Sequence, residues 1–137
     1  MLKNNAELYT DGGARGNPGP AGIGVVLEVK SQKSKVKRFI GEATNNQAEY
    51  QALLAGLELA ISAEVHELRV FMDSELIVKQ MKGEYRVKNS DLKPLFAQAL
   101  GLTNKFTTIS FHHIPREKNK EADKLVNEAI DQVTGNK

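Results

Sequence analysis

The sequence contains no cysteine and no tryptophan, and the missing cysteine already narrows the chemistry open to it. Without cysteine there is neither a disulfide framework nor a thiolate metal site. A bound metal ion must therefore take oxygen or histidine ligands, which favours a hard cation such as Mg²⁺ or Mn²⁺.

Long apolar runs and a strong charge of one sign are missing as well. No stretch approaches the ~20 apolar residues that cross a membrane, and residues 1–5 lack the apolar core of a signal peptide. We therefore expect an intracellular, cytoplasmic protein without a membrane partner. The net charge of +2 is too small to indicate a nucleic-acid partner by itself. Nothing specifies an oligomer, and we expect a monomer.

The chain has 137 residues, of which 40% are hydrophobic, the size and composition of one ordinary domain with a core. No repeat, low-complexity tract or long linker divides it. We expect residues 1–137 to form a single domain.

Hydrophobic patterning predicts an α/β fold. The expected strands cover residues 6–11, 21–29, 36–43, 67–72 and 107–114, with a turn at 31–34. The expected helices run from Asn45 or Asn46 as the cap to 63, from 74 to 81, from 90 or 91 to 102, and from 120 to 133, and residues 134–137 should fray.

The connections between these elements predict the sheet topology. Short connections make the first three strands antiparallel neighbours, whereas helical crossovers make strands one, four and five parallel. The result is a five-stranded mixed sheet of order 3-2-1-4-5, with helices on its faces. Asp11 and Asp73 end strands one and four in this interpretation, at the edge where such sheets bind ligands, and should stand side by side.

Two predicted helices each carry a carboxylate on an otherwise apolar face. Glu49 is followed at helical spacing by Leu53, Leu57, Ala60 and Ile61, and Asp123 by Val126, Ile130 and Val133. A charge on such a face needs a partner or loses its charge. The alternative is a partly exposed acid near a helix start, where the helix dipole favours negative charge.

Together with Asp11 and Asp73, these acids predict a metal centre. Two carboxylates about 4 Å apart repel by roughly 4 kcal/mol at an effective dielectric of 20. Two divalent ions balance four carboxylates and suit an in-line phosphoryl displacement. The sequence alone therefore indicates a candidate metal-dependent hydrolase.

Four segments carry a family resemblance: TDGGARGNPGP at 10–20, TNNQAE at 44–49, DS at 73–74 and HIPREKNKEAD at 113–123. In this order and over nearly the whole chain, they resemble ribonuclease H type 1. The resemblance implies the ribonuclease H-like fold and an endonuclease that hydrolyses the RNA strand of RNA–DNA hybrids, leaving 5′-phosphate and 3′-hydroxyl ends. It implies two Mg²⁺ ions, with Mn²⁺ as the alternative, and these ligands: Asp11, Glu49, Asp73 and Asp123. Double-stranded RNA is a further candidate substrate.

The resemblance also implies contacts with the substrate. Thr44 matches a position associated with a DNA-phosphate pocket, and four positions match contacts in the minor groove: Ala14, Asn17, Asn45 and Asn46. Gly12 would let the backbone approach the duplex closely. A plain turn is the alternative interpretation of the glycine segment.

His113 matches a region where the family often has a mobile histidine that helps proton transfer and product release. Two alternatives stay open. His113 simply ends the last strand, beside Ile109 and Phe111, or Arg116 serves the same purpose electrostatically.

The best-known bacterial enzymes of this family carry an extra basic helix, a protrusion rich in lysine and tryptophan. This chain lacks it and therefore resembles the compact, archaeal-type subgroup. We expect Lys82 and Arg86, with neighbouring lysines, to replace part of that surface, and the basic residues at 30–38 to be ordinary solvated charge. Glu75 stands where many relatives have glutamine, and a carboxylate cannot donate a hydrogen bond to a nucleotide.

Two other classes of function compete with the nuclease. A binding module could recognise a duplex without cutting it, but the presence of all four acids argues against that. A small-nucleotide-binding domain would need a phosphate loop or a dinucleotide fingerprint, and the spacing at Gly12–Gly16 matches neither.

Overall fold

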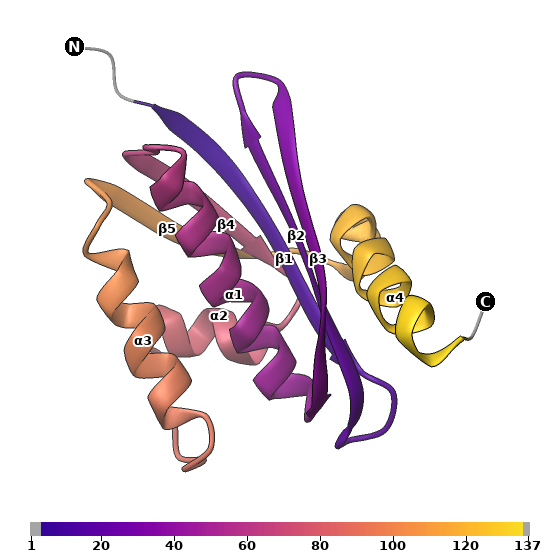
Figure 1. Ribbon diagram of the computed structural model, residues 1–137. Helices are drawn as coiled ribbons and strands as arrows, with labels where there is room; N and C mark the ends of the chain where they lie inside the picture. Colours follow the sequence, from indigo (N-terminus) through magenta and orange to yellow (C-terminus); the bar gives the residue numbers. More distant parts are fainter. Residues whose placement is uncertain (1–3, 136–137) are drawn as a thin grey trace.

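The computed structural model describes residues 4–135, which form one mixed sheet between two helical layers (Figure 1). The strands are β1 (Asn5–Ala14), β2 (Gly19–Val29), β3 (Gln32–Ala43), β4 (Glu67–Met72) and β5 (Thr108–His113), in the order β3-β2-β1-β4-β5. Strands β1, β2 and β3 pair antiparallel, and β1, β4 and β5 pair parallel. The predicted fold class, strand order and strand directions are confirmed.

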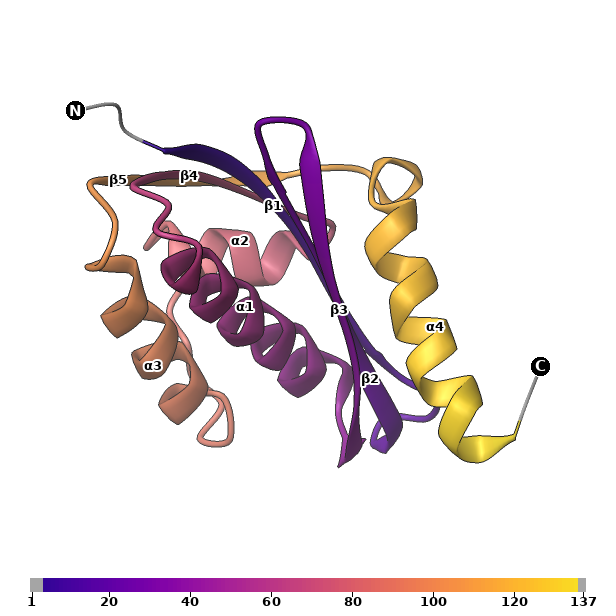
Figure 2. The ribbon, with the colours of Figure 1, turned by 45° about the horizontal axis from the view of Figure 1, so that its top comes forward.

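The helices are divided unequally between the two faces of the sheet (Figure 2). Helices α1 (Asn45–Ser62), α2 (Glu75–Met81) and α3 (Lys93–Thr103) lie on one face, and α4 (Lys120–Thr134) lies on the other, after a 3₁₀ turn at Arg116–Lys118. The main hydrophobic core fills the space between the sheet and α1, α2 and α3. Among residues 4–135, no helix combines the length and apolar character that a membrane crossing requires.

Helix α4 is held to the sheet by apolar contacts and by charge. Its inner side is buried through Ala122, Leu125, Val126, Ala129 and Ile130. Along its outer edge, Lys33 and Lys35 of β3 pair with Glu121 at 3.0 and 2.7 Å, and Lys37 pairs with Glu128 at 3.4 Å. We call these five residues the β3–α4 charge row. The basic residues at 30–38 are thus mostly exposed, as expected, but three of the lysines fasten a helix rather than simply facing solvent.

The first strand is longer than the sequence predicts. It continues past Asp11 because Gly12, Gly13 and Ala14 pair with β2 opposite Ile23, Gly22 and Ala21. Its parallel pairing with β4 nevertheless stops at Thr10, opposite Met72. Asp11 is therefore inside a strand on one side and beyond the last ladder pair on the other.

Other boundaries also need correction. The turn after β2 consists of Lys30 and Ser31 alone, so β3 starts at Gln32. Thr44, not Asn45 or Asn46, caps α1: its hydroxyl accepts from the Gln47 amide at 3.1 Å, and the Gln47 side chain accepts from the Thr44 amide at 2.8 Å.

At the later elements the differences are small. Helix α3 starts at 93 rather than 90 or 91, with proline in its first turn. Strand β5 is one residue shorter at each end than predicted. Thr134 is helical and Gly135 caps α4 in a left-handed conformation, whereas the predicted fraying of 136–137 lies outside the described residues.

On each face of the sheet, one glycine lets a helix approach closely. A Cβ atom added at Gly12 would lie 2.1 Å from the carbonyl oxygen of Ala48 in α1. A Cβ atom added at Gly24 would lie 2.1 Å from the carbonyl oxygen of Ala122 in α4. No side chain fits at such separations, so both helices pack directly against backbone.

These contacts determine where two acidic side chains lie. Ala48 and Ala122 immediately precede Glu49 and Asp123, and Gly24 pairs with Asp11. Close backbone packing therefore brings one carboxylate from each helical layer to the strand that carries Asp11.

We predict that Gly12→Ala lowers the free energy of unfolding by about 2 kcal/mol, because the added methyl group must push β1 and α1 apart. Gly13→Ala is the matched control, since a Cβ there would meet only the Val126 side chain, at an ordinary 3.6 Å. Urea unfolding in chelator measures both variants. Equal stability of the two would contradict the packing argument.

Candidate functional site

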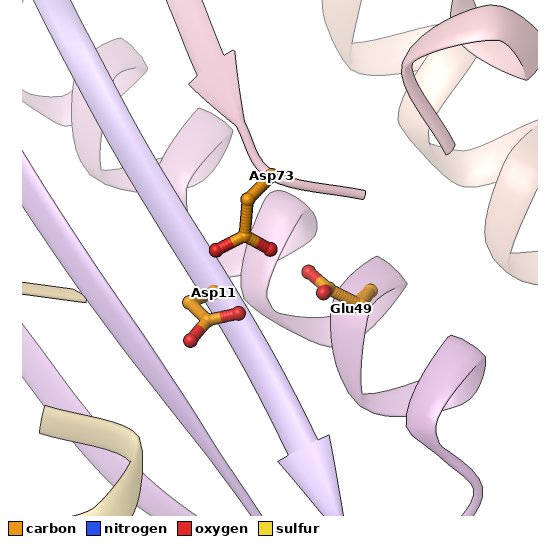
Figure 3. A group of neighbouring side chains, drawn as sticks. All are labelled: Asp11, Glu49 and Asp73. Atoms are coloured by element: carbon orange, nitrogen blue, oxygen red, sulfur yellow. The ribbon is translucent and has the colours of Figure 1, made fainter. Parts of the chain in front are cut away.

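Three carboxylates from three elements converge at the carboxyl edge of the parallel strands (Figure 3). Asp11 comes from β1, Asp73 directly follows β4, and Glu49 comes from α1. One oxygen from each lies within 4.8 Å of the others. The convergence follows from the pairing register: because Thr10 and Met72 form the last pair between β1 and β4, Asp11 and Asp73 come next on adjacent strands.

Asp123 reaches the same place from the other layer. It lies in the first turn of α4, is half-buried, and lines a cavity of about 450 Å³ together with the other three acids. The negative charge of Asp123 and a hydrogen bond between the two side chains both raise the pKa of Asp11. The four predicted acids therefore face one cavity, with Asp123 outside the tight group of three.

The cluster is under electrostatic stress. Asp11 is 6% exposed and Glu49 is 8% exposed. Burial, then the charges of Asp73 and Asp123, raises the pKa of Asp11 to about 8. Burial, then the charges of Asp11 and Asp73, raises the pKa of Glu49 well above its usual value, although the Gly12 amide donates to its Oε1 at 3.3 Å.

The helix dipole accounts for one of the two helical acids but not for the other. Glu49 lies beyond the first turn of α1, so the helix dipole does not explain an acid at this buried position. Asp123 does lie in a first turn, where the dipole favours its charge. Of the apolar stripe predicted beside it, Val126 and Ile130 are buried, whereas Val133 is 58% exposed.

Two arginines line the acidic cavity. Arg116 faces Asp11 and acts to lower its pKa. Arg15 is engaged elsewhere: it pairs with Asp131 at 2.5 Å and donates to Asn127 Oδ1 at 3.3 Å, which ties the end of β1 to α4.

The residues present fit a divalent cation. The clustered ligand atoms are carboxylate oxygens, the donors that hard cations prefer. Burial and mutual repulsion raise the pKa values of Asp11 and Glu49, and Arg116 offsets only part of this for Asp11; a bound cation would supply the missing positive charge.

Several of the predicted contact residues surround this cavity. Gly12, Ala14 and Asn45 line it. Asn45 Oδ1 accepts from the Ala14 amide at 2.9 Å, and Asn17 Oδ1 accepts from the Asn45 amide at 3.0 Å. The β1–β2 connection and the start of α1 are thereby joined into one rim.

Two further predicted residues, Thr44 and Asn46, lie at the start of α1 beside this rim. Thr44 is occupied in capping α1, and Asn46 is half-buried in the first turn beside it. The sequence interpretation places Gly12 against a duplex, but the space where its side chain would stand is filled by Ala48.

The remaining predicted residues are not part of the cavity lining. His113 is exposed at the end of β5, opposite Met72, and it is Arg116 that lines the cavity instead. Lys82 and Arg86 are exposed in the segment after α2, where Lys82 pairs with Glu84 at 3.5 Å.

Asn119 is a residue that the sequence interpretation leaves without a role. It is 1% exposed, and its Nδ2 donates to the carbonyl oxygen of Thr10 at 2.9 Å and to Asp73 Oδ2 at 3.3 Å. It lies within the 113–123 segment that carries the family resemblance, but its place just before the last helix predicts only a helix cap.

Comparisons with known proteins agree on one family. A model described as "Reverse transcriptase-like" matches residues 9–129. The chain is 46% identical over 127 residues to the bifunctional protein Rv2228c of Mycobacterium tuberculosis, covering 90% of this chain and 35% of that protein. It is 43% identical over 128 residues to ribonuclease HI of Halobacterium salinarum, covering 91% of this chain and 64% of that one. The chain thus spans only part of the length of these relatives.

Solved structures are similar over almost the whole chain. The N-terminal ribonuclease H domain of Rv2228c superposes with a TM-score of 0.94 at 43% identity, covering 97% of this chain and 98% of that one. LC11-RNase H1, solved in complex with an RNA/DNA hybrid, superposes with a TM-score of 0.88 at 49% identity, covering 94% and 99%.

We predict that, in chelator, the free energy of unfolding falls as the pH rises from about 4 to about 8. Because the pKa of Asp11 rises from 3.8 to about 8 on folding, the folded chain keeps a proton that the unfolded chain releases in this window. Asp73→Asn removes one of the repelling charges, so it should raise stability at neutral pH and flatten the profile.

Urea unfolding across this pH range measures the effect, and Asp91→Asn, at an exposed position before α3, is the control that should keep the wild-type profile. Stability that rises with pH in chelator would contradict close convergence of the acids.

Proposed function

This chain belongs to the type 1 ribonuclease H family, and from that premise we propose that it is an endonuclease that hydrolyses the RNA strand of RNA–DNA hybrids by a two-metal-ion mechanism. The products would carry 5′-phosphate and 3′-hydroxyl ends. The observation that carries the proposal is the convergence of Asp11, Glu49 and Asp73 within 4.8 Å, with Asp123 on the same cavity. The hybrid bound to LC11-RNase H1 supports the choice of substrate.

The four carboxylates would hold the ions, with Mg²⁺ as the first candidate and Mn²⁺ as the alternative. Divalent cations held there would supply an activated water and would stabilise the leaving oxygen. The chain itself fixes the ligands by its rigid elements, since Asp11 belongs to β1, Asp73 directly follows the adjacent β4, and the other two belong to helices packed against glycine backbone.

The rim of the cavity is suited to a duplex with A-like geometry. The Oδ1 atoms of Asn45 and Asn17 accept backbone amides, and both residues are exposed, so their Nδ2 groups remain as candidate donors to a substrate. In a wide, shallow minor groove, such donors meet 2′-hydroxyl and base acceptors. Ala14 adds a small side chain at the same rim, so the backbone there can come close to the groove.

Arg116 is the residue we assign to the substrate phosphate. It lines the acidic cavity, and its charge acts to lower the pKa of Asp11. A guanidinium can bind two phosphate oxygens at once. The same charge would help a product phosphate to leave the acids. The proton-transfer role of His113 stays a prediction, because its side chain is exposed at the end of β5 and does not line the cavity.

We predict that Asp11→Asn abolishes Mg²⁺-dependent cleavage of a labelled hybrid while the protein still folds and binds the duplex in chelator. Asp91→Asn is the matched control and should cleave within about twofold of wild type, since Asp91 is exposed and does not line the cavity. Wild-type rates from Asp11→Asn would refute the ligand assignment. Binding without cleavage by the wild-type protein would instead favour a pure binding module, and double-stranded RNA serves as the comparison substrate.

We predict that Lys82→Ala with Arg86→Ala reduces the slope of log affinity against log salt for the hybrid by about 2, one unit for each lost phosphate contact. The matched control is Lys30→Ala with Lys105→Ala. It removes the same charge from the edge of the sheet opposite the acidic cavity, so the slope should stay unchanged. Filter binding of Asp11→Asn protein at several salt concentrations measures the slope. An equal slope in both double variants would show that the segment after α2 does not contact phosphate.

A further inference from the structure

The side chain of Asn119 connects the two chain segments that carry Asp11 and Asp73: it contacts β1 and the residue that directly follows β4. It precedes α4, is 1% exposed, and spans from the carbonyl oxygen of Thr10 to Asp73 Oδ2. Its own carbonyl oxygen accepts the backbone amide of Asp123 at 3.1 Å. One residue is thus bonded to Asp73, to the neighbour of Asp11, and to Asp123.

The orientation of the Asn119 amide is fixed by its partners. Both the Thr10 carbonyl and the Asp73 carboxylate are acceptors, so only the nitrogen of the amide can face them. A flipped amide would turn an oxygen toward two oxygens. The consequence of this orientation is visible at the other end of the group, where Asn119 Oδ1 is buried without a hydrogen-bond partner among the described residues.

Asn119 does not do what its position in the helix predicts. Asparagine at this position normally accepts a hydrogen bond from an amide in the first helical turn, which stabilises the helix. Here the side chain makes no such bond to α4 and points to the acids instead. The helix gives up its side-chain cap, and the atom that would have capped it stays unpaired.

We propose that Asn119 is a positioning residue for the metal ligands: its Nδ2 holds the Asp73 carboxylate in the orientation that binds a divalent cation and fixes the separation of β1 from the start of α4. The inference rests on the proposed function, because it concerns the same cavity. Removal of a residue that orients metal ligands in this way lowers the affinity for the metal ion about 10- to 100-fold. Asn119 touches neither substrate nor reacting atoms in this role.

Two variants separate positioning from helix capping. Asn119→Ser retains a hydroxyl that can cap α4 but is too short to span Thr10 and Asp73, whereas Asn119→Ala can do neither. If Asn119 positions the acids, both variants bind Mn²⁺ about 10- to 100-fold more weakly than wild type, although the serine variant melts at the higher temperature. If it serves only the helix, the serine variant binds Mn²⁺ like wild type.

The experiment is calorimetric titration of Mn²⁺ into each protein without nucleic acid, after circular dichroism in chelator has shown the folded state. Asn89→Ser is the control, because Asn89 accepts an amide at the turn before α3 and does not line the acidic cavity. A Kd for Asn119→Ser within twofold of wild type overturns the proposal, as does an equal loss in Asn89→Ser.

Hybrid cleavage gives a second readout. Asn119→Ser should lower kcat with little change in KM, and raising the Mn²⁺ concentration should restore part of the loss. A rise in KM alone, with normal kcat and no response to Mn²⁺, counts against positioning. The two levels of inference stay distinguishable: wild-type protein that binds Mn²⁺ but leaves hybrids uncut refutes the proposed nuclease, whereas only the comparison of the variants decides the role of Asn119.

Discussion

Direct contact between glycine backbone and helix backbone, on both faces of one sheet, is the constraint on which the acidic cavity depends. Gly12 admits α1 and Gly24 admits α4, each against an alanine that precedes an acid. Side chains normally keep a helix and a sheet well apart, and at that distance the carboxylates of the two helices would not reach Asp11. The chemistry of the site thus follows from two positions that carry no functional group at all.

The same packing holds together charges that repel one another. Two of the acids are buried, and burial together with the neighbouring negative charges raises the pKa of both, because each carboxylate lacks water and a sufficient counter-charge. Arg116 compensates only part of this. Hydrophobic burial in the main core, between the sheet and α1, α2 and α3, offsets the remainder. In the proposed function, a bound cation would relieve a stress that folding has already created.

Local patterns in the sequence and the lengths of its connections predict most of this architecture, including the strand order, but not every contact between distant segments. Strand order, strand direction and the limits of β4 follow from alternation and connection lengths. The extension of β1 past Asp11 is invisible locally, because glycine-rich sequence becomes strand only when β2 pairs with it. The convergence of the acids can be predicted from topology. The inward turn of Asn119 cannot, since its partners lie 109 and 46 residues away and its own position indicates a cap.

The β3–α4 charge row makes ionic strength act on the protein itself and not only on its ligand. The helix that carries Asp123 is fastened along its outer edge by three lysine contacts to glutamates at partly exposed positions, and exposed pairs of this kind weaken as mobile ions screen them. In concentrated electrolyte, α4 keeps its apolar seat but loses its electrostatic fastening. If the proposed cleavage is measured against salt concentration, the curve would therefore combine two responses: weaker binding of substrate phosphates and weaker attachment of α4 to β3.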